Sequence, residues 1–352
     1  MRFSKNILVE ASAPLRIEVG TFLDQLGVAT LHDREGLHTA TIAIGMYTRL
    51  RIAPILGDVV RIRAGEVQEE FTHPLPLDSR FGIVNACLTH FDITGADITL
   101  NFEAPTHCGL GGSSILMTLL CASLLSAEQP ELSDSEIKLR AAKISVMLEN
   151  GLFAPTGYQD QLSSIYGGVQ LFHWKVLEAI PFMREELLPE AFHEELSSRL
   201  LVAFAGERHS SADATELMMR SFKRGGDERK KWLKTNTFTV AFAAALKERN
   251  WNDAIAAINQ ANELRCELVP TVLSGRVAAL RQVCQAHAAG FGLAGAGAGG
   301  CAFSLSSTTE ASQTLEQEWR RLITQFGEGD VWRPGISGGM QVHRIEDSCS
   351  QS

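Results

Sequence analysis

Residues 105–116 read PTHCGLGGSSIL, and we expect the fold to be built around this short glycine-rich stretch. Before it, residues 97–103 (DITLNFE) alternate apolar and polar side chains, which indicates a strand. After it, residues 113–125 form an apolar run of helical length. The sequence therefore predicts a strand, a glycine loop and a helix in direct succession.

Such a loop is a favourable place for an anion. Gly109, Gly111 and Gly112 allow the backbone to approach a ligand closely. The first turn of the helix offers unpaired N–H groups at the positive end of its dipole. The hydroxyls of Ser113 and Ser114 suit that turn and can reach a metal or a phosphate. Because no Lys follows the glycines, this is not the Walker pattern, and a tight turn without a ligand is the alternative.

The stretch resembles the second motif of the GHMP kinases, the superfamily of galactokinase, homoserine kinase and mevalonate kinase, usually written P-x-x-x-G-L-G-S-S-A. The residues that carry the resemblance are Pro105, Gly109, Leu110, Gly111, Ser113 and Ser114. Gly112 stands where the first Ser is usual. The resemblance implies that these residues, with Gly112, bind ATP.

A second resemblance lies near the N-terminus. Residues 12–20 (SAPLRIEVG) are similar to the first GHMP motif, and in particular to the A-P-L-R-I opening of heptose 7-phosphate kinases. The resemblance implies that Arg16 lies near the transferred phosphate or the reacting hydroxyl, where a guanidinium offsets negative charge. An Arg that caps a sheet edge is the alternative. The next segment, residues 21–27, departs from the pattern, and Asp24 in it is a candidate for a sugar hydroxyl.

Residues 133–150 are predicted to form a helix. Ser133 and Glu136 have the spacing of a capping box, and Gly151 is expected to end the helix. Glu149 stands at the carboxyl end, where the dipole disfavours a carboxylate. The family resemblance implies that Glu149 binds Mg²⁺ together with Ser113. A solvated surface glutamate is the alternative.

The segment at 156–168, TGYQDQLSSIYGG, resembles the G-x-x-D-Q segment of galactokinase-like and heptose-kinase-like enzymes. The resemblance implies that Asp160 is the catalytic aspartate, which accepts the proton of the substrate hydroxyl. It also places Gly157 and Gln159 on the substrate side. The alternative for Asp160 is an N-cap of a turn at 161–166.

Two further glycine-containing stretches follow. Residues 206–212 (GERHSSA) are similar to a T-G-x-x-R-x-S turn of heptose-kinase-like proteins, so Arg208 is expected to face the cleft, unless this is a polar loop without a ligand. Residues 291–301 (FGLAGAGAGGC) resemble the third GHMP motif, which implies that Gly297 lies on the substrate side. Because strand-like residues follow this run, it is not a dinucleotide fingerprint, whose glycines open a helix.

Helical patterns are expected between these glycine stretches, at 212–223, 231–249, 251–268 and 275–289, with another at 312–326. The charged segment 223–231 (KRGGDERKK) is predicted to be a solvated loop. Segments at 38–44, 47–53, 58–64 and 66–71 read as antiparallel strands with one wet face.

The composition bounds the possibilities further. The chain has 352 residues, enough for two domains, and its net charge of −9 argues against nucleic-acid binding. Seven Cys without a CxxC pair indicate neither a zinc site nor a disulfide framework. The sequence shows no signal peptide or membrane-spanning run, so a cytosolic protein is expected.

The resemblance spans residues 12–301 and implies a two-domain α+β protein. Residues 1–188 are expected to form a GHMP kinase N-terminal ATP-binding domain of the ribosomal protein S5 domain 2-like type. Residues 189–352 are expected to form a ferredoxin-like C-terminal domain. The predicted protein is a monomer or homodimer, which uses ATP and Mg²⁺ to phosphorylate the anomeric hydroxyl of a sugar or sugar phosphate. The alternatives are a non-catalytic sensor, a kinase of a non-sugar alcohol and a decarboxylase of the mevalonate branch.

Overall fold

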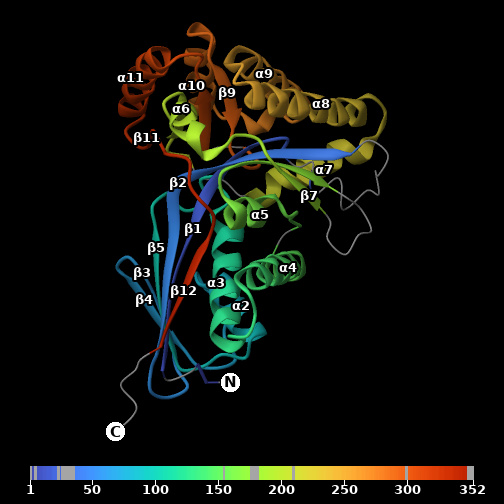
Figure 1. The fold of residues 1–352 in the computed structure, drawn as a ribbon. Coiled ribbons are helices and arrows are strands. Elements are labelled where there is room, and N and C mark those ends of the chain that lie inside the picture. Colours follow the sequence, from blue (N-terminus) through green and yellow to red (C-terminus); the bar gives the residue numbers. More distant parts are fainter. Residues whose placement is uncertain are drawn as a thin grey trace.

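The computed structural model describes residues 2–3, 6–21, 24, 36–153, 155–174, 182–207, 211–297 and 300–346. Two sheets organise these residues, one of eight strands and one of four. Figure 1 shows the larger sheet with α3 and α4 on one side, and the smaller sheet with its helices beyond one end of it. The expected two-domain α+β architecture is confirmed.

The larger sheet runs in the order β12-β1-β2-β5-β3-β4, with β6 and β7 joined to β2. Its strands are β1 (Ile7–Val19), β2 (Leu37–Pro54), β3 (Val60–Ala64), β4 (Val67–Phe71), β5 (Ala96–Phe102), β6 (Val169–Trp174), β7 (Phe182–Glu186) and β12 (Gln341–Glu346). β2 is long enough to pair with β6 through its first half and with β5 through its second. The two segments expected at 38–44 and 47–53 are therefore one strand, which continues through a bulge opposite Pro14 and Leu15.

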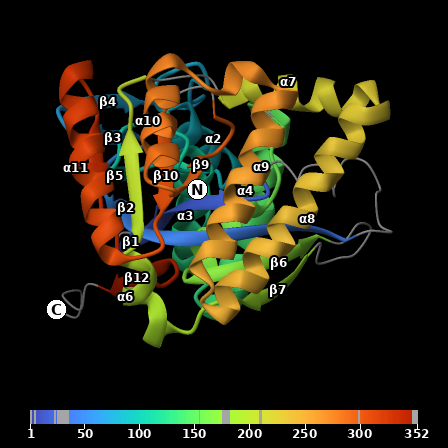
Figure 2. The same cartoon turned by 90° about the horizontal axis from the view of Figure 1, so that it is seen from above.

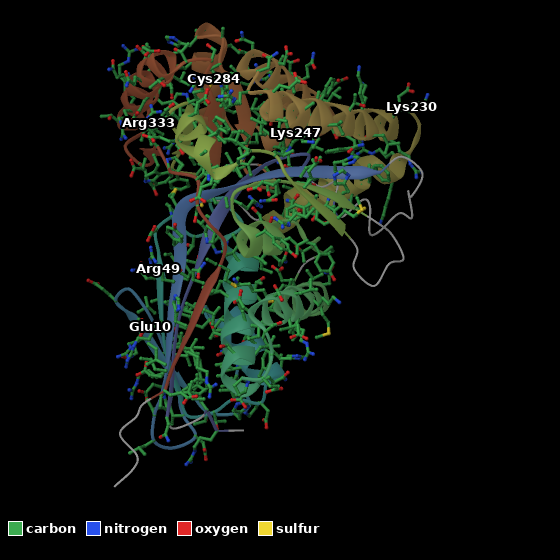
Figure 3. All side chains as sticks on the ribbon, viewed as in Figure 1. Glu10, Arg49, Lys230, Lys247, Cys284 and Arg333 are labelled. Carbon is green, nitrogen blue, oxygen red and sulfur yellow. The ribbon has the colours of Figure 1, made fainter. Side chains whose placement is uncertain are left out.

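One face of this sheet is covered and the other is wet. α3 (Gly112–Glu128) packs on β1, β2 and β12, and α4 (Asp134–Leu152) and α2 (Gly82–His90) pack on α3. Because α3 lies between sheet and helices, almost all of it is buried, which explains its apolar sequence. Glu10 and Arg49 lie on the opposite face (Figure 3). The predicted wet face is confirmed, but β3 runs parallel to β5 and antiparallel only to β4.

The smaller sheet is antiparallel, in the order β11-β8-β10-β9. Its strands are β8 (Leu200–Phe204), β9 (Gly290–Leu293), β10 (Cys301–Leu305) and β11 (Asp330–Trp332). The first strand of this unit thus lies between the fourth and the third, with helices after the first and third strands, which is the ferredoxin-like arrangement. The expected C-terminal fold is confirmed.

Helices surround this sheet. They are α6 (His193–Ser197), α7 (Ser211–Arg224), α8 (Gly226–Glu248), α9 (Trp251–Leu268), α10 (Gly275–Ala286) and α11 (Thr309–Phe326). α9, α10 and α11 pack against the sheet, as the view from above shows (Figure 2). α8 lies along α9 and reaches across to β2 of the larger sheet, where Asn236 Oδ1 accepts from the backbone N–H of His38 at 2.8 Å.

Two local predictions are wrong. The charged segment at 223–231 is not a loop, because α8 begins at Gly226. The Asp227–Lys230 ion pair lies on the surface of α8, the Arg224–Glu228 pair joins the end of α7 to its first turn, and buried Trp232 anchors its first turns. Gly151 does not end α4, which has the predicted capping box at Ser133 but runs on to Leu152.

The last strand crosses back to the first domain. β12 pairs antiparallel with β1 along its whole length, from Gln341 opposite Ser12 to Glu346 opposite Ile7. The segment before it also bridges to β2, since Ser337 N–H donates to Ala43 O at 2.9 Å. By strand pairing, the end of the described chain thus belongs to the larger sheet, whereas the boundary near Leu188 stays a prediction.

Candidate active site

Arg16 and Asp160 form the centre of the candidate site, although they come from different elements. Arg16 points from β1, and Asp160 lies in the first turn of α5 (Gln159–Tyr166). Arg16 Nε donates to Asp160 Oδ1 at 2.8 Å, and Nη2 lies 2.7 Å from the same oxygen. Arg16 is buried in the interior of the sheet, so the sheet-edge alternative is wrong. Asp160 does not cap α5 either, because the N-cap is Tyr158.

The glycine loop lies against this pair. Arg16 Nη1 donates to Gly109 O at 2.7 Å, and Arg16 N–H donates to Leu110 O at 3.3 Å. Gly111 has a φ of +81°, and a Cβ added there would lie 3.3 Å from both Arg16 Nε and Asp160 Cγ. The positive φ and this close approach together favour glycine between the loop and the pair. The loop and the two candidate catalytic residues therefore form one unit.

The start of α3 is open on its outer side. A Cβ added at Gly112 would meet nothing within 4 Å, and the Ser113 side chain is exposed. Pro105 is half-buried and Leu110 is buried below the loop. A helix start with free space and an exposed hydroxyl suits a phosphate group. The assignment of these residues to ATP stays a prediction.

Glu149 is buried, with 8% of its surface exposed, so the surface alternative is wrong. Ser114 Oγ donates to its Oε1 at 2.7 Å, and Gln161 Nε2 donates to its Oε2 at 2.8 Å. Burial raises the pKa of the Glu149 carboxyl to about 7, and nearby Asp160 acts in the same direction. A cation beside Glu149 would offset this cost of burial.

The described residues contain no group of three or more His, Cys, Asp or Glu arranged to hold a metal ion. Mg²⁺ does not need such a group, since it commonly takes one or two carboxylates together with phosphate oxygens and waters. The serine hydroxyls at the start of α3 and the Glu149 carboxylate are oxygen ligands of the kind that such a Mg²⁺ site uses. Ser113 follows directly on the glycine loop, but the serine that contacts Glu149 is Ser114.

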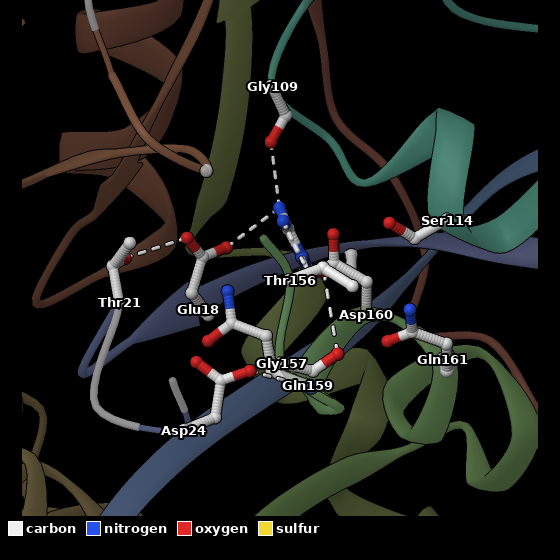
Figure 4. Close-up of polar contacts among 12 residues, drawn as sticks. Glu18, Thr21, Asp24, Gly109, Ser114, Thr156, Gly157, Gln159, Asp160 and Gln161 are labelled. Carbon is white, nitrogen blue, oxygen red and sulfur yellow. Dashed lines mark hydrogen bonds and ion pairs between the residues drawn. The ribbon is translucent and has the colours of Figure 1, made fainter. Parts of the chain in front are cut away.

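Asp24, Gly157 and Gln159, which the sequence assigns to the substrate, lie together. Gln159 N–H donates to Asp24 Oδ2 at 3.1 Å, and Asp24 is fully buried. A Cβ added at Gly157 would lie 1.8 Å from that same oxygen, so glycine is required for this approach. Figure 4 shows this group beside Asp160, with Ser114 and Gln161 on the other side of the aspartate in that view.

The third glycine stretch packs against the glycine loop at 105–114. A Cβ added at Gly295 would lie 2.4 Å from Gly109 O, so the two loops touch through their backbones. A Cβ added at Gly297 would meet Val272 and the Arg265 guanidinium. Arg208 and its neighbours at 209–210 lie outside the described residues.

Sequence reasoning missed two buried charged residues. Glu18 lies 2.8 Å from Arg16 Nη1, and Arg265 reaches the third glycine stretch through Gly295 O at 2.5 Å. The position of Glu18 could have been predicted, because it follows Arg16 by two residues on a strand and therefore lies on the same face of the sheet. The burial of Arg265 could also have been predicted, since helical spacing puts it on the same face of α9 as Ala261 and Asn262.

Comparisons with known proteins agree with this geometry. The model of the GHMP kinases N terminal domain matches residues 80–168, and that of the GHMP kinases C terminal domain matches residues 242–324. Together they contain the second-motif loop, Glu149, Asp160 and the third glycine stretch.

In the part of the chain that the structure describes, no helix combines the length and hydropathy needed to cross a bilayer.

A curated relative is the bifunctional fucokinase/GDP-fucose pyrophosphorylase of Arabidopsis thaliana, which is 27% identical over 245 residues. The match covers 68% of this chain but 22% of the relative, so the chain spans about a fifth of that protein's length. The fold is shared with a D-glycero-D-manno-heptose 1-phosphate kinase from Bacteroides thetaiotaomicron, at a TM-score of 0.71, 14% identity and coverage of 96% and 99% of the two chains. The fold is also shared with Lactococcus lactis galactokinase complexed with galactose, at a TM-score of 0.70 and 14% identity, with 95% of each chain covered.

Proposed function

We propose that this chain, which carries the N-terminal and C-terminal domains of the GHMP kinases, is an ATP-dependent kinase that phosphorylates the anomeric hydroxyl of a sugar or sugar phosphate. The observation that supports it most is the Arg16–Asp160 contact at 2.7 and 2.8 Å, made beside a glycine loop that opens a helix. The fucokinase part of the curated relative's name supports a sugar.

In this proposal Asp160 accepts the proton of the attacking hydroxyl and aligns that oxygen on the γ-phosphate. Arg16 offsets the negative charge that develops on the transferred group. Burial acts to lower the pKa of Arg16, but the Asp160 and Glu18 carboxylates outweigh it and raise the pKa above its usual value. Arg16 therefore stays a cation throughout the working pH range. The open α3 start would receive the phosphates of ATP.

Ser113 and Glu149 would hold Mg²⁺, which would neutralise charge on the phosphates when bound. Ser114 and Gln161 orient the Glu149 carboxylate by donating to its two oxygens. Asp24, Gly157 and Gln159 would form the wall that meets the sugar. For a substrate with a distal phosphate, Arg208 remains the candidate cation.

The test is an ATP-consumption screen over free sugars and sugar phosphates, with Asp160→Asn as the control. Phosphorylation at C1 removes the reducing end, so loss of reducing groups should follow ADP release one for one. ADP release with the reducing end intact would move the phosphate to another hydroxyl. Nucleotide binding without turnover on any member of the panel would favour the sensor, and turnover only with non-sugar alcohols would favour a different kinase.

A further inference from the structure

Glu18 contacts the edge of the Arg16 guanidinium that Asp160 leaves free. We propose that Glu18 is a positioning residue, which fixes the orientation of Arg16 and is itself held from the C-terminal domain by Arg265 through Thr21. Its importance for turnover depends on the proposed function, in which Arg16 acts on the transferred phosphate. Its effect on the Arg16 side chain does not.

The contacts define the orientation from both edges of the guanidinium. Nε and Nη2 form one edge and both reach Asp160 Oδ1. Nη1, on the other edge, lies 2.8 Å from Glu18 Oε2 and donates to Gly109 O at 2.7 Å. A planar guanidinium bound at both edges cannot turn without breaking charge-assisted contacts. Without Glu18, one neutral carbonyl would remain on the second edge.

Glu18 is in turn held by a chain of contacts that crosses the two domains. Thr21 Oγ1 donates to Glu18 Oε1 at 2.7 Å, as Figure 4 shows, and Arg265 Nη1 donates to Thr21 Oγ1 at 3.3 Å. Arg265 also donates to Leu293 O at 3.3 Å and to Gly295 O at 2.5 Å. Helix α9 thereby ties the end of β1 to the third glycine stretch.

The charges along this chain alternate in sign. Burial raises the pKa of Glu18 above its usual value; Arg16 opposes this effect, and the nearby Asp160 carboxylate adds to it. Burial lowers the pKa of Arg265 to about 10, which still leaves it protonated near neutral pH. The Glu18 carboxylate therefore lies between two buried cations, since it contacts Arg16 directly and reaches Arg265 through Thr21.

Glu18 does not have the surroundings of a substrate-binding residue. The cavity beside it, which Thr21, Asn262 and Arg265 also line, measures about 20 Å³. That is close to the space of one or two waters, whereas small-molecule sites usually measure roughly 300 Å³ or more. The geometry therefore assigns Glu18 to the support of Arg16.

The first measurement needs no substrate. In protein labelled with ¹⁵N-arginine, the Nε–Hε resonance of Arg16 is assigned by its loss in Arg16→Lys. Glu18→Gln should shift this resonance and speed the rotation of the guanidinium. Glu316→Gln is the matched control, because Glu316 Oε2 lies 2.8 Å from Arg333 Nη2, the same length as the Glu18 contact, in a pair outside the site. It should leave the Arg16 resonance unchanged.

The second measurement is kinetic. Glu18→Gln should lower kcat by about 10–100-fold with KM for ATP within about twofold, because a misplaced guanidinium costs transition-state stabilisation more than nucleotide binding. Glu18→Asp keeps the charge and should recover part of kcat even if it lowers the melting temperature as much as Gln does. Adding Arg265→Met to Glu18→Gln should cost less than the two single losses combined.

An Arg16 resonance that is unchanged in Glu18→Gln overturns the proposal, whether or not the protein is a kinase. A kcat loss that follows the melting temperature equally in Asp and Gln variants also overturns it, because that is the behaviour of a merely structural residue. Absence of turnover in the wild-type protein, with the Arg16 resonance shifted as expected, refutes the proposed function and keeps the positioning role.

Discussion

Asp160 Oδ1 accepts from Arg16 Nε and lies 2.7 Å from Nη2, across 144 residues of chain, so the candidate catalytic pair exists only in the folded protein. β1 and α5 meet at the start of α3, where the glycine loop also ends. The pair is therefore placed by the same packing that positions the glycine loop, and each of its members can be tested by a separate substitution.

Replacing Asp160 with Asn should lower kcat by about 10²–10⁴-fold, the usual range for a positioned general base. Binding of ATP should persist, because the glycine loop is unchanged, and equilibrium titration with a non-hydrolysable analogue measures it. Asp134→Asn, an exposed carboxylate in the first turn of α4, is the control. Turnover of Asp160→Asn within about threefold of the wild type would show that Asp160 is not the base.

Ser113→Ala and Glu149→Gln should each raise the Mg²⁺ concentration needed for half-maximal activity, because few protein oxygens hold the ion. Their double variant should lose less than the two single losses combined if both act through one ion. Ser123→Ala is a matched change in α3, since its hydroxyl donates to Leu119 O of the same helix. An unchanged Mg²⁺ requirement with fully additive losses would exclude a shared site.

Glu149 should also make stability depend on pH in the nucleotide-free and metal-free protein. Its folded pKa of about 7 lies above the ordinary value of 4.5, so between these values the folded state holds a proton that the unfolded chain has released. Stability should therefore fall as pH rises through this window, by about 3 kcal/mol at most.

Glu149→Gln should remove that part of the fall, so its melting temperature relative to the wild type should increase from pH 5 to pH 8. Thermal unfolding of both proteins across this range measures the difference. Melting curves that shift in parallel with pH would mean that Glu149 does not carry the raised pKa. Addition of Mg²⁺ and nucleotide at pH 8 should raise the melting temperature of the wild type relative to Glu149→Gln, since a nearby cation favours the charged carboxylate.

The sequence predicts local units better than contacts between them. The strand, glycine loop and helix around Gly111 follow from residues within one short stretch, and the capping box at Ser133 is local as well. The Arg16–Asp160 contact could be expected only through the family resemblance. The Thr21–Arg265 contact joins residues 244 positions apart, and no local pattern specifies such a partner. The start of α8 was missed because its charged residues resemble a solvated loop, whereas buried Trp232 is what fixes that end of the helix.

The position of Asp24, which we propose meets the sugar, depends on Gly157, because the Asp24 carboxylate packs directly against the backbone there. In Gly157→Ala the new Cβ would lie 1.8 Å from Asp24 Oδ2, so the carboxylate or the loop before α5 must move. If Asp24 binds the sugar, KM for the sugar should rise by about tenfold or more while KM for ATP stays near the wild-type value, because the glycine loop is not involved. Gly151→Ala is the matched control, since an added Cβ inside α4 meets nothing within 4 Å and should be neutral or slightly stabilising. An unchanged KM for the sugar in Gly157→Ala, in a protein that melts at a lower temperature, would show that Asp24 supports the loop and does not meet the substrate.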